Sequence, residues 1–138
     1  MVHALQEAWR VLVPGGIMID VRPLCVDVPL EILTPAGSES AGLVDMNPEI
    51  DKDIASDAAI QAVIGDGLYK MVEQEYFDFA YYWNSIREFK ADLDERWKDE
   101  VILPIEVLKQ ARALFKKQQD DARLRIRIRM KLAKFTKS

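Results

Sequence analysis

The sequence has very little of what disulfides, zinc sites and histidine-dependent catalysis require. Its 138 residues include one cysteine, Cys25, and one histidine, His3. A single cysteine excludes an intramolecular disulfide and a cysteine-based zinc site, and a lone histidine beside the amino terminus argues against a Ser-His-Asp arrangement. Asp51, Asp53 and Asp57 lie close together, but they lack the regular alternation and final glutamate of a calcium loop. We therefore expect no metal site.

Long apolar runs are missing as well. No stretch approaches the ~18–20 apolar residues that cross a bilayer, and the amino terminus lacks the charged-then-apolar pattern of a signal peptide. With 49% hydrophobic and 30% charged residues, the composition is that of a soluble globular protein. The length suits one domain over residues 1–138. These features predict a cytoplasmic protein that does not bind membranes.

The beginning of the chain has the pattern of a helix followed by a strand. Apolar residues at positions 5, 8, 9 and 12 recur with the spacing of one helical face. Pro14, Gly15 and Gly16 then predict a tight turn, because proline cannot continue the helical hydrogen bonds. The segment 17–21 is short and almost wholly apolar, which is typical of a strand buried on both faces of a parallel sheet.

Residues 23–55 are expected to form an irregular insert. Prolines at positions 23, 29, 35 and 48 interrupt the region, so only short extended pieces fit. We interpret these pieces as a hairpin with strands at 30–34 and 42–46, joined by a turn at 37–40.

The insert is followed by a predicted helix. Ser56 is a favourable N-cap residue, and an apolar stripe continues from Ile60 to Met71. Gly65 and Gly67 lie inside this stripe. They do not make a phosphate loop, because no strand precedes them and no third glycine follows, so we interpret them as part of the helix.

The rest of the chain predicts a strand, two helices and a final strand. Residues 76–83 alternate strictly, with aromatic side chains at 77, 79, 81 and 83 on one side. Ser85 and Glu88 have the spacing of a capping box, and Pro104 suits the first turn of another helix. A long alternating strand follows at 123–132. The sequence therefore predicts an α/β fold in which a small mixed sheet is flanked by helices.

Charge is distributed unevenly along the chain. All 23 acidic residues precede residue 122, and the final strand alternates apolar residues with basic ones, namely Arg123, Arg125, Arg127, Arg129 and Lys131. Such a row can bind an anion, but sites for single-stranded nucleic acid combine basic groups with aromatic ones, and here aliphatic residues alternate with arginine. The pattern favours ion pairs within the protein, with Asp78 and the acidic helix at 85–100 as expected partners. An anion- or RNA-binding module is the alternative.

One stretch resembles a known family. Residues 7–16 read Glu-Ala-Trp-Arg-Val-Leu-Val-Pro-Gly-Gly, which resembles the E-x-x-R-V-L-x-P-G-G stretch of class I S-adenosylmethionine-dependent methyltransferases. In that family the stretch leads into the fifth strand, which here would be 17–21. The run 76–97 is similar to the sixth strand and its following helix. The terminal strand would be the seventh, which lies antiparallel between the fifth and sixth. The resemblance implies the C-terminal portion of a Rossmann-like methyltransferase fold, apart from the insert.

The resemblance also indicates which parts of such an enzyme have no counterpart in this sequence. These parts are the glycine-rich cofactor loop and the fourth strand, which helps to form the active site. We therefore expect no cofactor in the isolated chain, and S-adenosylmethionine only if another chain or an N-terminal half completes the site. The resemblance puts the substrate pocket near Asp20 and Arg22, with Tyr81 and Trp83 as further candidates. The alternative is that Asp20 and Arg22 pair with neighbouring side chains. No catalytic residue is identified.

A strand at 17–21 without a fourth strand beside it would present an apolar edge, which favours aggregation unless it is covered. We therefore expect a homodimer formed through this edge or the adjacent helix face, since two-fold dimers are the commonest closed assembly. The predicted function is that of a methyltransferase-like fragment, inactive as an isolated chain, in a dimer or a larger assembly. The alternatives are a methyltransferase completed by another chain or an N-terminal half, and the anion- or RNA-binding module.

Overall fold

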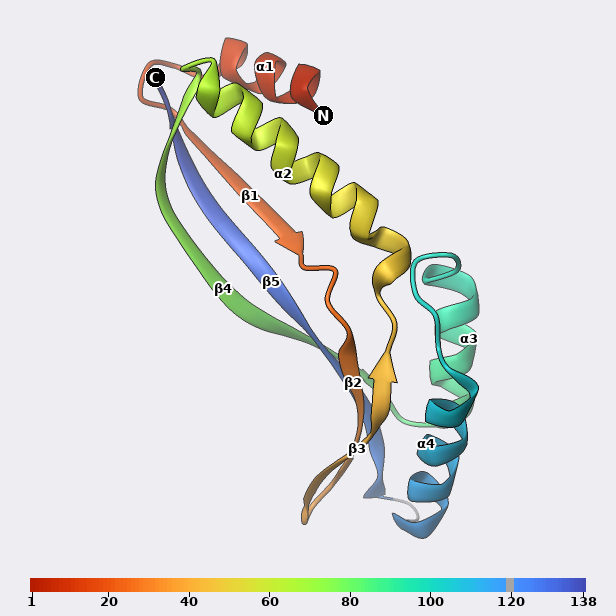
Figure 1. The fold of residues 1–138 in the computed structure, drawn as a ribbon. Helices are drawn as coiled ribbons and strands as arrows, with labels where there is room; N and C mark the ends of the chain where they lie inside the picture. The colour runs from red at the N-terminus through yellow and green to blue at the C-terminus, as the bar shows by residue number, and fades with distance from the viewer. Residues whose placement is uncertain (119–120) are drawn as a thin grey trace. The chain divides into compact units, whose positions relative to one another are not determined.

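The computed structural model describes residues 1–118 and 121–138 (Figure 1). Its helices are α1 (Val2–Val11), α2 (Ile50–Gly65), α3 (Ile86–Arg96) and α4 (Ile105–Gln118), with a short 3-10 helix, η1 (Asn47–Glu49). Its strands are β1 (Ile17–Pro23), β2 (Val28–Thr34), β3 (Gly37–Val44), β4 (Tyr69–Trp83) and β5 (Arg123–Lys137). The predicted α/β class and the predicted order of elements are confirmed.

The five strands form one sheet in the order β1-β5-β2-β3, and β4 also pairs with β5. The pairs β1–β5, β2–β3 and β2–β5 are all antiparallel. The predictions of a mixed sheet and of a parallel strand at 17–21 are therefore wrong. A short apolar run is compatible with either direction, because its pattern reports burial and not the orientation of its neighbour.

The chain forms two compact units. Unit 1 comprises residues 1–24, 51–77 and 129–138, and unit 2 comprises residues 25–50 and 78–128. Both β4 and β5 contribute residues to each unit, since each strand is 15 residues long.

In unit 1, α1 and α2 pack with β4 and β5 around one core. Leu5 of α1, Ile60 and Val63 of α2, and Phe135 of β5 are buried together. Tyr69 at the start of β4 joins them, and its hydroxyl donates to the carbonyl oxygen of Leu5 at 2.8 Å. Figure 1 shows α2 alongside β1, with α1 near the end of the unit where the C-terminus lies. The predicted apolar face of the first helix is therefore the face that it buries.

The sequence predicted that the strand at 17–21 is buried on both faces. In the structure, one face of β1 is exposed. Ile17, Ile19 and Val21 are 52%, 51% and 47% exposed. The alternate residues Asp20 and Arg22 are partly buried, because they lie on the face that meets α2. β1 is at the end of the strand order and is an edge strand. An edge strand with three exposed apolar side chains is thus present in unit 1.

The helix α2 begins at Ile50, so the prediction that Ser56 caps it is wrong. The 3-10 helix that contains Pro48 leads directly into it, and Asp51 and Asp53 lie in its first turn. Carboxylates at this position interact favourably with the positive end of the helix dipole. Ser56 is therefore an interior residue of the helix.

Glycine ends α2, although the prediction continued the helix through Gly65 and Gly67. Gly67 has a φ of +75°, a conformation that costs glycine little and other residues much more. The Gly67 N–H donates to the carbonyl of Ile64 at 2.9 Å, and the Leu68 N–H donates to the carbonyl of Val63 at 3.0 Å. These two bonds form a Schellman motif, which stops the helix and leaves the next residues to begin β4.

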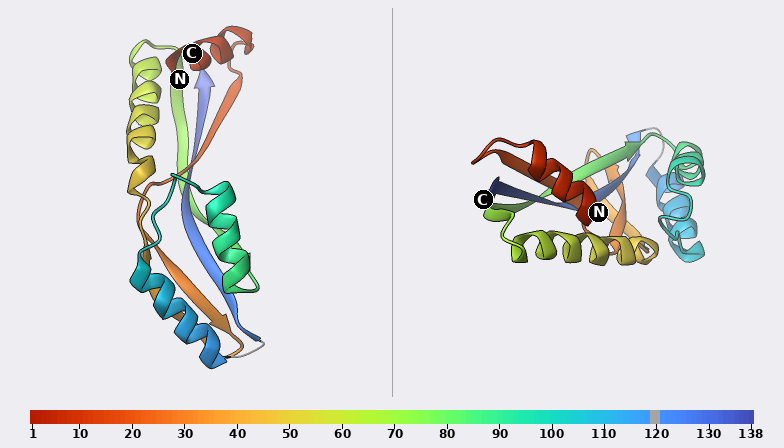
Figure 2. Two further views of the ribbon diagram at one scale, coloured as in Figure 1. Left: turned by 90° about the vertical axis from the view of Figure 1, so that its right-hand side faces the viewer. Right: turned by 90° about the horizontal axis from the view of Figure 1, so that it is seen from above.

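In unit 2, the predicted hairpin is confirmed as β2 and β3, and it packs against α4. Its turn lies at residues 35–36, so the predicted turn at 37–40 is wrong. α3 contacts α4, and Figure 2 shows the two helices close together. The largest fully buried side chains of the unit are Leu30, Ile32, Val44, Phe89, Leu124 and Ile126.

The predicted starts of α3 and α4 correspond to the structure. The Glu88 N–H donates to Ser85 Oγ at 3.1 Å, and the Glu88 carboxylate accepts from the Asn84 N–H at 3.0 Å. This is a capping box whose return bond is shifted by one residue. α4 begins directly after Pro104, whose carbonyl accepts hydrogen bonds from residues 107 and 108.

The final strand buries different residues in the two units. In unit 2 the even-numbered Leu124, Ile126 and Ile128 are buried, whereas in unit 1 the odd-numbered Ala133 and Phe135 are buried. The sequence predicted one even-numbered apolar face over 123–132. That prediction holds for the first half of the strand only.

Candidate functional site

Arg22 is held by three carboxylates within unit 1. Its Nε donates to Asp20 Oδ2 at 2.8 Å, and its terminal nitrogens donate to Asp53 Oδ1 at 3.4 Å and Asp57 Oδ1 at 2.7 Å. Asp20 and Arg22 are two residues apart on β1 and so share a face. Asp53 and Asp57 are one turn apart on α2 and so share a face of the helix. Arg22 therefore links the strand to the helix.

A second cation completes this cluster. Lys131 is the register partner of Arg22 on the neighbouring strand β5, and its Nζ donates to Asp57 Oδ1 at 2.9 Å. The hydrogen bonds from Arg22 and Lys131 lower the pKa of Asp57. Burial alone would lower the pKa of Arg22, but the bonds to Asp57 and Asp20 outweigh it and raise that pKa. These shifts favour the charged forms of Asp57 and Arg22.

This geometry bears on the predicted role of Arg22 in binding an anionic substrate. Each of its three guanidinium nitrogens already donates to a carboxylate, and its side chain is only 14% exposed. An approaching anion would meet Asp20, Asp53 and Asp57 at the same place and be repelled by them. The contacts favour the alternative in which Asp20 and Arg22 pair with neighbouring side chains.

Tyr81 and Trp83 lie together in unit 2, within an aromatic cluster. Their rings are stacked with centroids 6.2 Å apart, and Trp97 and Phe89 of the α3 region pack edge-on against them. Trp83 Nε1 donates to Asp92 Oδ2 at 2.9 Å. Hydrogen bonds from Arg96, and more weakly from Trp83, lower the pKa of Asp92 despite its partial burial. Packing therefore accounts for the positions of Tyr81 and Trp83.

The four predicted substrate-binding residues are divided between the units. Asp20 and Arg22 belong to unit 1, and Tyr81 and Trp83 belong to unit 2. The structure brings together the members of each pair.

The arginine row of β5 is partly neutralised by one glutamate. Arg125 Nε donates to Glu31 Oε2 at 2.6 Å, and an Arg127 terminal nitrogen donates to Glu31 Oε1 at 2.7 Å. Glu31 is on β2, directly opposite Arg125 in the register, and it is 6% exposed. Burial would raise the pKa of Glu31, but the two arginines together lower it. Arg123 lies over the ring of Tyr82 and Arg129 over the ring of Tyr76.

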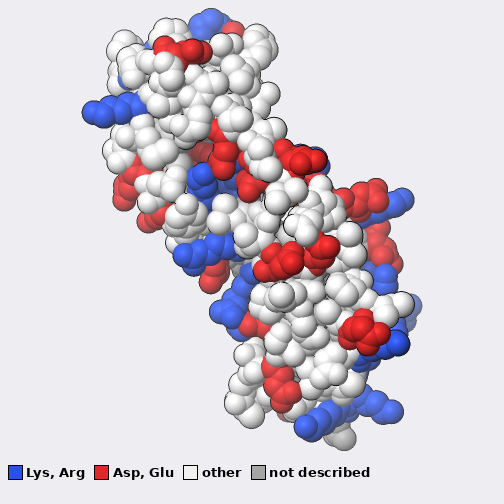
Figure 3. Space-filling model, viewed as in Figure 1, with Lys and Arg blue, Asp and Glu red and all other residues white. Residues whose placement is uncertain are grey.

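Sequence reasoning predicted internal partners for this row but did not identify Glu31. It named Asp78 and the acidic helix at 85–100 instead. The available signal was a single carboxylate inside the apolar run Val-Pro-Leu-Glu-Ile-Leu, at residues 28–33. A charged residue in a buried strand needs a partner, and the arginine row was the obvious candidate. Opposite charges also lie next to each other on the face of the molecule drawn in Figure 3.

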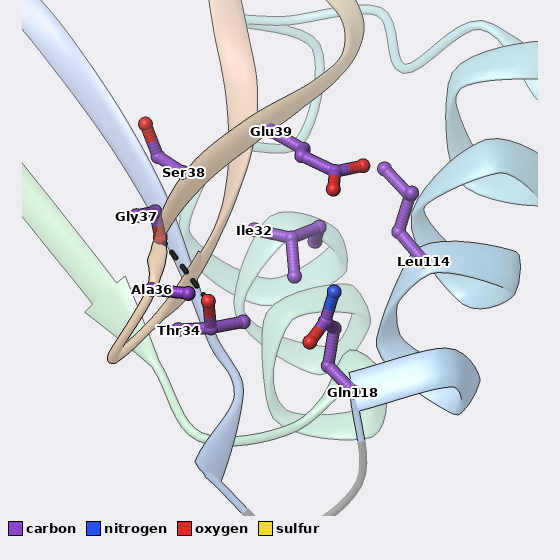
Figure 4. Close-up of a pocket in the computed structure, with 8 residues that line it drawn as sticks. All are labelled: Ile32, Thr34, Ala36, Gly37, Ser38, Glu39, Leu114 and Gln118. Atoms are coloured by element: carbon purple, nitrogen blue, oxygen red, sulfur yellow. Dashed lines mark hydrogen bonds between the residues drawn. The ribbon is translucent and has the colours of Figure 1, made fainter.

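Hollows of modest size also lie among the described residues of unit 2. One, of about 130 Å³, lies between the tip of the β2–β3 hairpin and the end of α4, where Ile32, Glu39, Leu114 and Gln118 point toward one another (Figure 4). The other, of about 560 Å³, lies between α3 and the segment that follows it, beside Trp97. Neither hollow is lined by a histidine or a cysteine.

Two further features are absent from residues 1–118 and 121–138. These residues contain no group of three or more histidine, cysteine or acidic side chains placed to hold a metal ion. They also include no helix with the length and apolarity needed to cross a membrane.

Comparison with known proteins gave no match to a family model, a curated protein or a solved structure.

Proposed function

We propose that this chain is a methyltransferase-like α/β portion that is not catalytic by itself and acts in a homodimer or a larger assembly. The observation that carries the proposal is the pairing of the last strand. β5 is antiparallel to β1 and also pairs with β4. This is the arrangement that the family resemblance implies for its seventh strand, between the fifth and the sixth.

The turn before β1 supports the proposal as well. α1 ends at Val11, and Gly15 has a φ of +73°. The Gly16 N–H donates to the Val13 carbonyl at 2.8 Å, and a Cβ on Gly16 would lie 2.8 Å from that same oxygen. The two glycines of the family-like stretch therefore have a structural role in this chain. They support a shared fold and carry no argument for an activity.

The candidate residues support a non-catalytic role for the chain alone. The arginine that could clamp an anion is bonded to three carboxylates, and Trp83 is buried against α3. A transferase needs an activated acceptor and a bound donor in contact. We infer that another chain or segment would have to supply most of such a site.

The exposed edge of β1 is where the partner is proposed to bind. Ile17, Ile19 and Val21 form an apolar row on an edge strand, and such edges tend to pair with further strands. A second copy of this chain, paired through β1 or the adjacent helix face, would cover the row.

Light scattering on the purified chain tests the assembly. We expect a mass twice the 15.8 kDa of one chain, and Ile19→Lys should convert it to a monomer. Ile105→Lys is the matched control, because Ile105 is also exposed, at 69%, but lies on α4 in unit 2. A wild-type mass of 15.8 kDa at all concentrations would exclude the homodimer.

A calorimetric titration with S-adenosylmethionine tests the other half of the proposal. We expect no heat of binding from the chain alone. Saturable binding with one ligand per chain would overturn the non-catalytic assignment. It would favour the alternative, an S-adenosylmethionine-dependent methyltransferase whose site is completed by a second copy.

A further inference from the structure

We propose that one face of the unit 2 sheet binds single-stranded nucleic acid through Tyr82, Arg123, Arg125 and Arg127, here called the arginine face. This inference is independent of the methyltransferase-like proposal, because it uses residues that the latter does not need.

The arginine face is the side of β5 opposite the core of unit 2. Leu124 and Ile126 are fully buried, so the arginines that alternate with them lie on the other side of the strand. Residues that are paired across a sheet share a face. Arg125 is paired with Glu31, and Glu31 with the exposed Ser40 of β3. The face therefore extends from the arginines of β5 across β2 to a hydroxyl on β3.

An aromatic side chain from the neighbouring strand lies among these arginines. The Arg123 guanidinium carbon is 4.6 Å from the centre of the Tyr82 ring. Tyr82 nevertheless remains 45% exposed. The sequence of β5 argued against nucleic acid because no aromatic residue alternates with its arginines. The pairing of β4 with β5 supplies the missing ring, on which a base can stack.

Charge on this face favours an anionic partner. Glu31 pairs with both Arg125 and Arg127, and Asp78 alternates onto the same side of β4 as Tyr82. The three arginines still exceed these two carboxylates. Alternate residues of a strand are about 6.6–6.8 Å apart, a spacing comparable with that of successive phosphates in an extended single strand. Glu31 holds two of the guanidinium groups in place, which lowers the entropic cost of binding.

A nucleic acid fits this face better than an acidic peptide does. Both would pair with guanidinium groups, but only the nucleic acid has planar bases that can stack on the half-exposed Tyr82.

Fluorescence anisotropy of the full chain with a labelled 12-nucleotide oligo(U) RNA tests the proposal. We expect saturable binding that weakens with salt. Two phosphates neutralised by Arg123 and Arg127 would give a log–log slope of about −1.4 against salt concentration. The absence of saturable binding at low salt would overturn the proposal. Displacement of the RNA by polyglutamate at equal charge concentration would also overturn it, in favour of a surface for acidic peptides.

Variants locate the binding on the arginine face. Arg123→Ser combined with Arg127→Ser should weaken RNA binding at least about ten-fold, as expected for the loss of two charged contacts. Lys116→Ser combined with Lys117→Ser removes the same charge from exposed positions on α4, and should change the affinity less than about two-fold. Equal losses in the two double variants would mean nonspecific attraction and would contradict the proposal.

A second pair of variants tests the stacking and does not depend on the arginine variants folding. Tyr82→Phe keeps the ring and should retain most of the affinity, whereas Tyr82→Leu should lose about five-fold or more, as expected for the loss of one stacked base. The salt slope should be the same in both variants. Equal affinity of Phe and Leu variants would exclude stacking on Tyr82 and overturn the proposed site.

Discussion

Arg22 on β1 and Asp57 on α2 lie 2.7 Å apart, and the side chain of Arg22 is only 14% exposed. Two further carboxylates and Lys131 surround this pair. The result is a half-buried ionic cluster that fixes the helix against the sheet in unit 1. A charge in such a place is tolerated because each group has an opposite partner.

Removing Arg22 should therefore destabilise the chain. In Arg22→Met, Asp20, Asp53 and Asp57 lose a shared cation, and we expect the free energy of unfolding to fall by about 2 kcal/mol. Urea denaturation measures this change. Arg10→Met is the control, because Arg10 pairs with Glu7 at an exposed site and should cost less than about 0.5 kcal/mol. Equal costs for the two variants would show that the cluster adds no stability.

Stability should fall in acid in a way that depends on Glu31. Its pKa is lowered in the folded protein by Arg125 and Arg127. The resulting stabilisation is present above the ordinary pKa of 4.5 and is lost as the pH falls through the lower value of the folded state. The difference in unfolding free energy between wild type and Glu31→Gln should be largest at neutral pH and shrink below about pH 4. Urea unfolding at a series of pH values measures it, and a difference that does not change with pH would contradict the assignment.

The two glycines at the end of α2 should respond oppositely to alanine. Gly65 is the last helical residue, with no heavy atom within 4 Å of a Cβ, so Gly65→Ala should stabilise the chain by about 0.5–1 kcal/mol. Gly67 has equal space but a φ of +75°, so Gly67→Ala should destabilise it by about 1 kcal/mol. Thermal unfolding of the two variants compares the effect of helix propensity at Gly65 with that of backbone strain at Gly67. Stabilisation by both variants would mean that α2 does not end in a Schellman motif.

Loss of the cap on α3 should have a measurable cost. Ser85→Ala removes the acceptor of the Glu88 N–H, and we expect a loss of about 1 kcal/mol in the free energy of unfolding. Ser85→Asp should retain most of the stability, since aspartate is an equally good N-cap residue. If Ser85→Asp lost as much as Ser85→Ala, the capping bond would not be the cause.

The sequence predicted the helices and strands better than it predicted the packing between them. The alternation of 76–83 identified a strand, but only its end is packed, because α3 covers Trp83 while Phe79 remains 48% exposed. An alternating pattern shows which residues share a face and does not show how far a helix extends over that face. The start of β4 at Tyr69 was missed because the apolar stripe of α2 continued into it.

The candidate site was predicted least well, for a similar reason. Arg22 and Asp57 are 35 residues apart in the chain, and Arg125 and Glu31 are 94 residues apart. Such pairs depend on strand register and on the packing of a helix, neither of which is readable from spacing. Ser56 and Gly67 show a different limit. Serine marks the start of a helix only when it is the N-cap residue, and glycine marks the end only where the backbone has a positive φ. Of these two residues, only Gly67 lies at a helix boundary.

The change of burial along β5 has a consequence for mutational tolerance. Polar substitutions should be harmful at even positions up to Ile128 and at odd positions from Ala133 onward. In a saturation scan of the strand, sensitive and tolerant positions should therefore alternate. The sensitive positions should change from even-numbered to odd-numbered once along the strand. Deleting one residue from 129–132 would shift the chain by one position and turn one hydrophobic set toward water. These four residues, none of which is buried, are consequently the part of the strand whose length is most constrained.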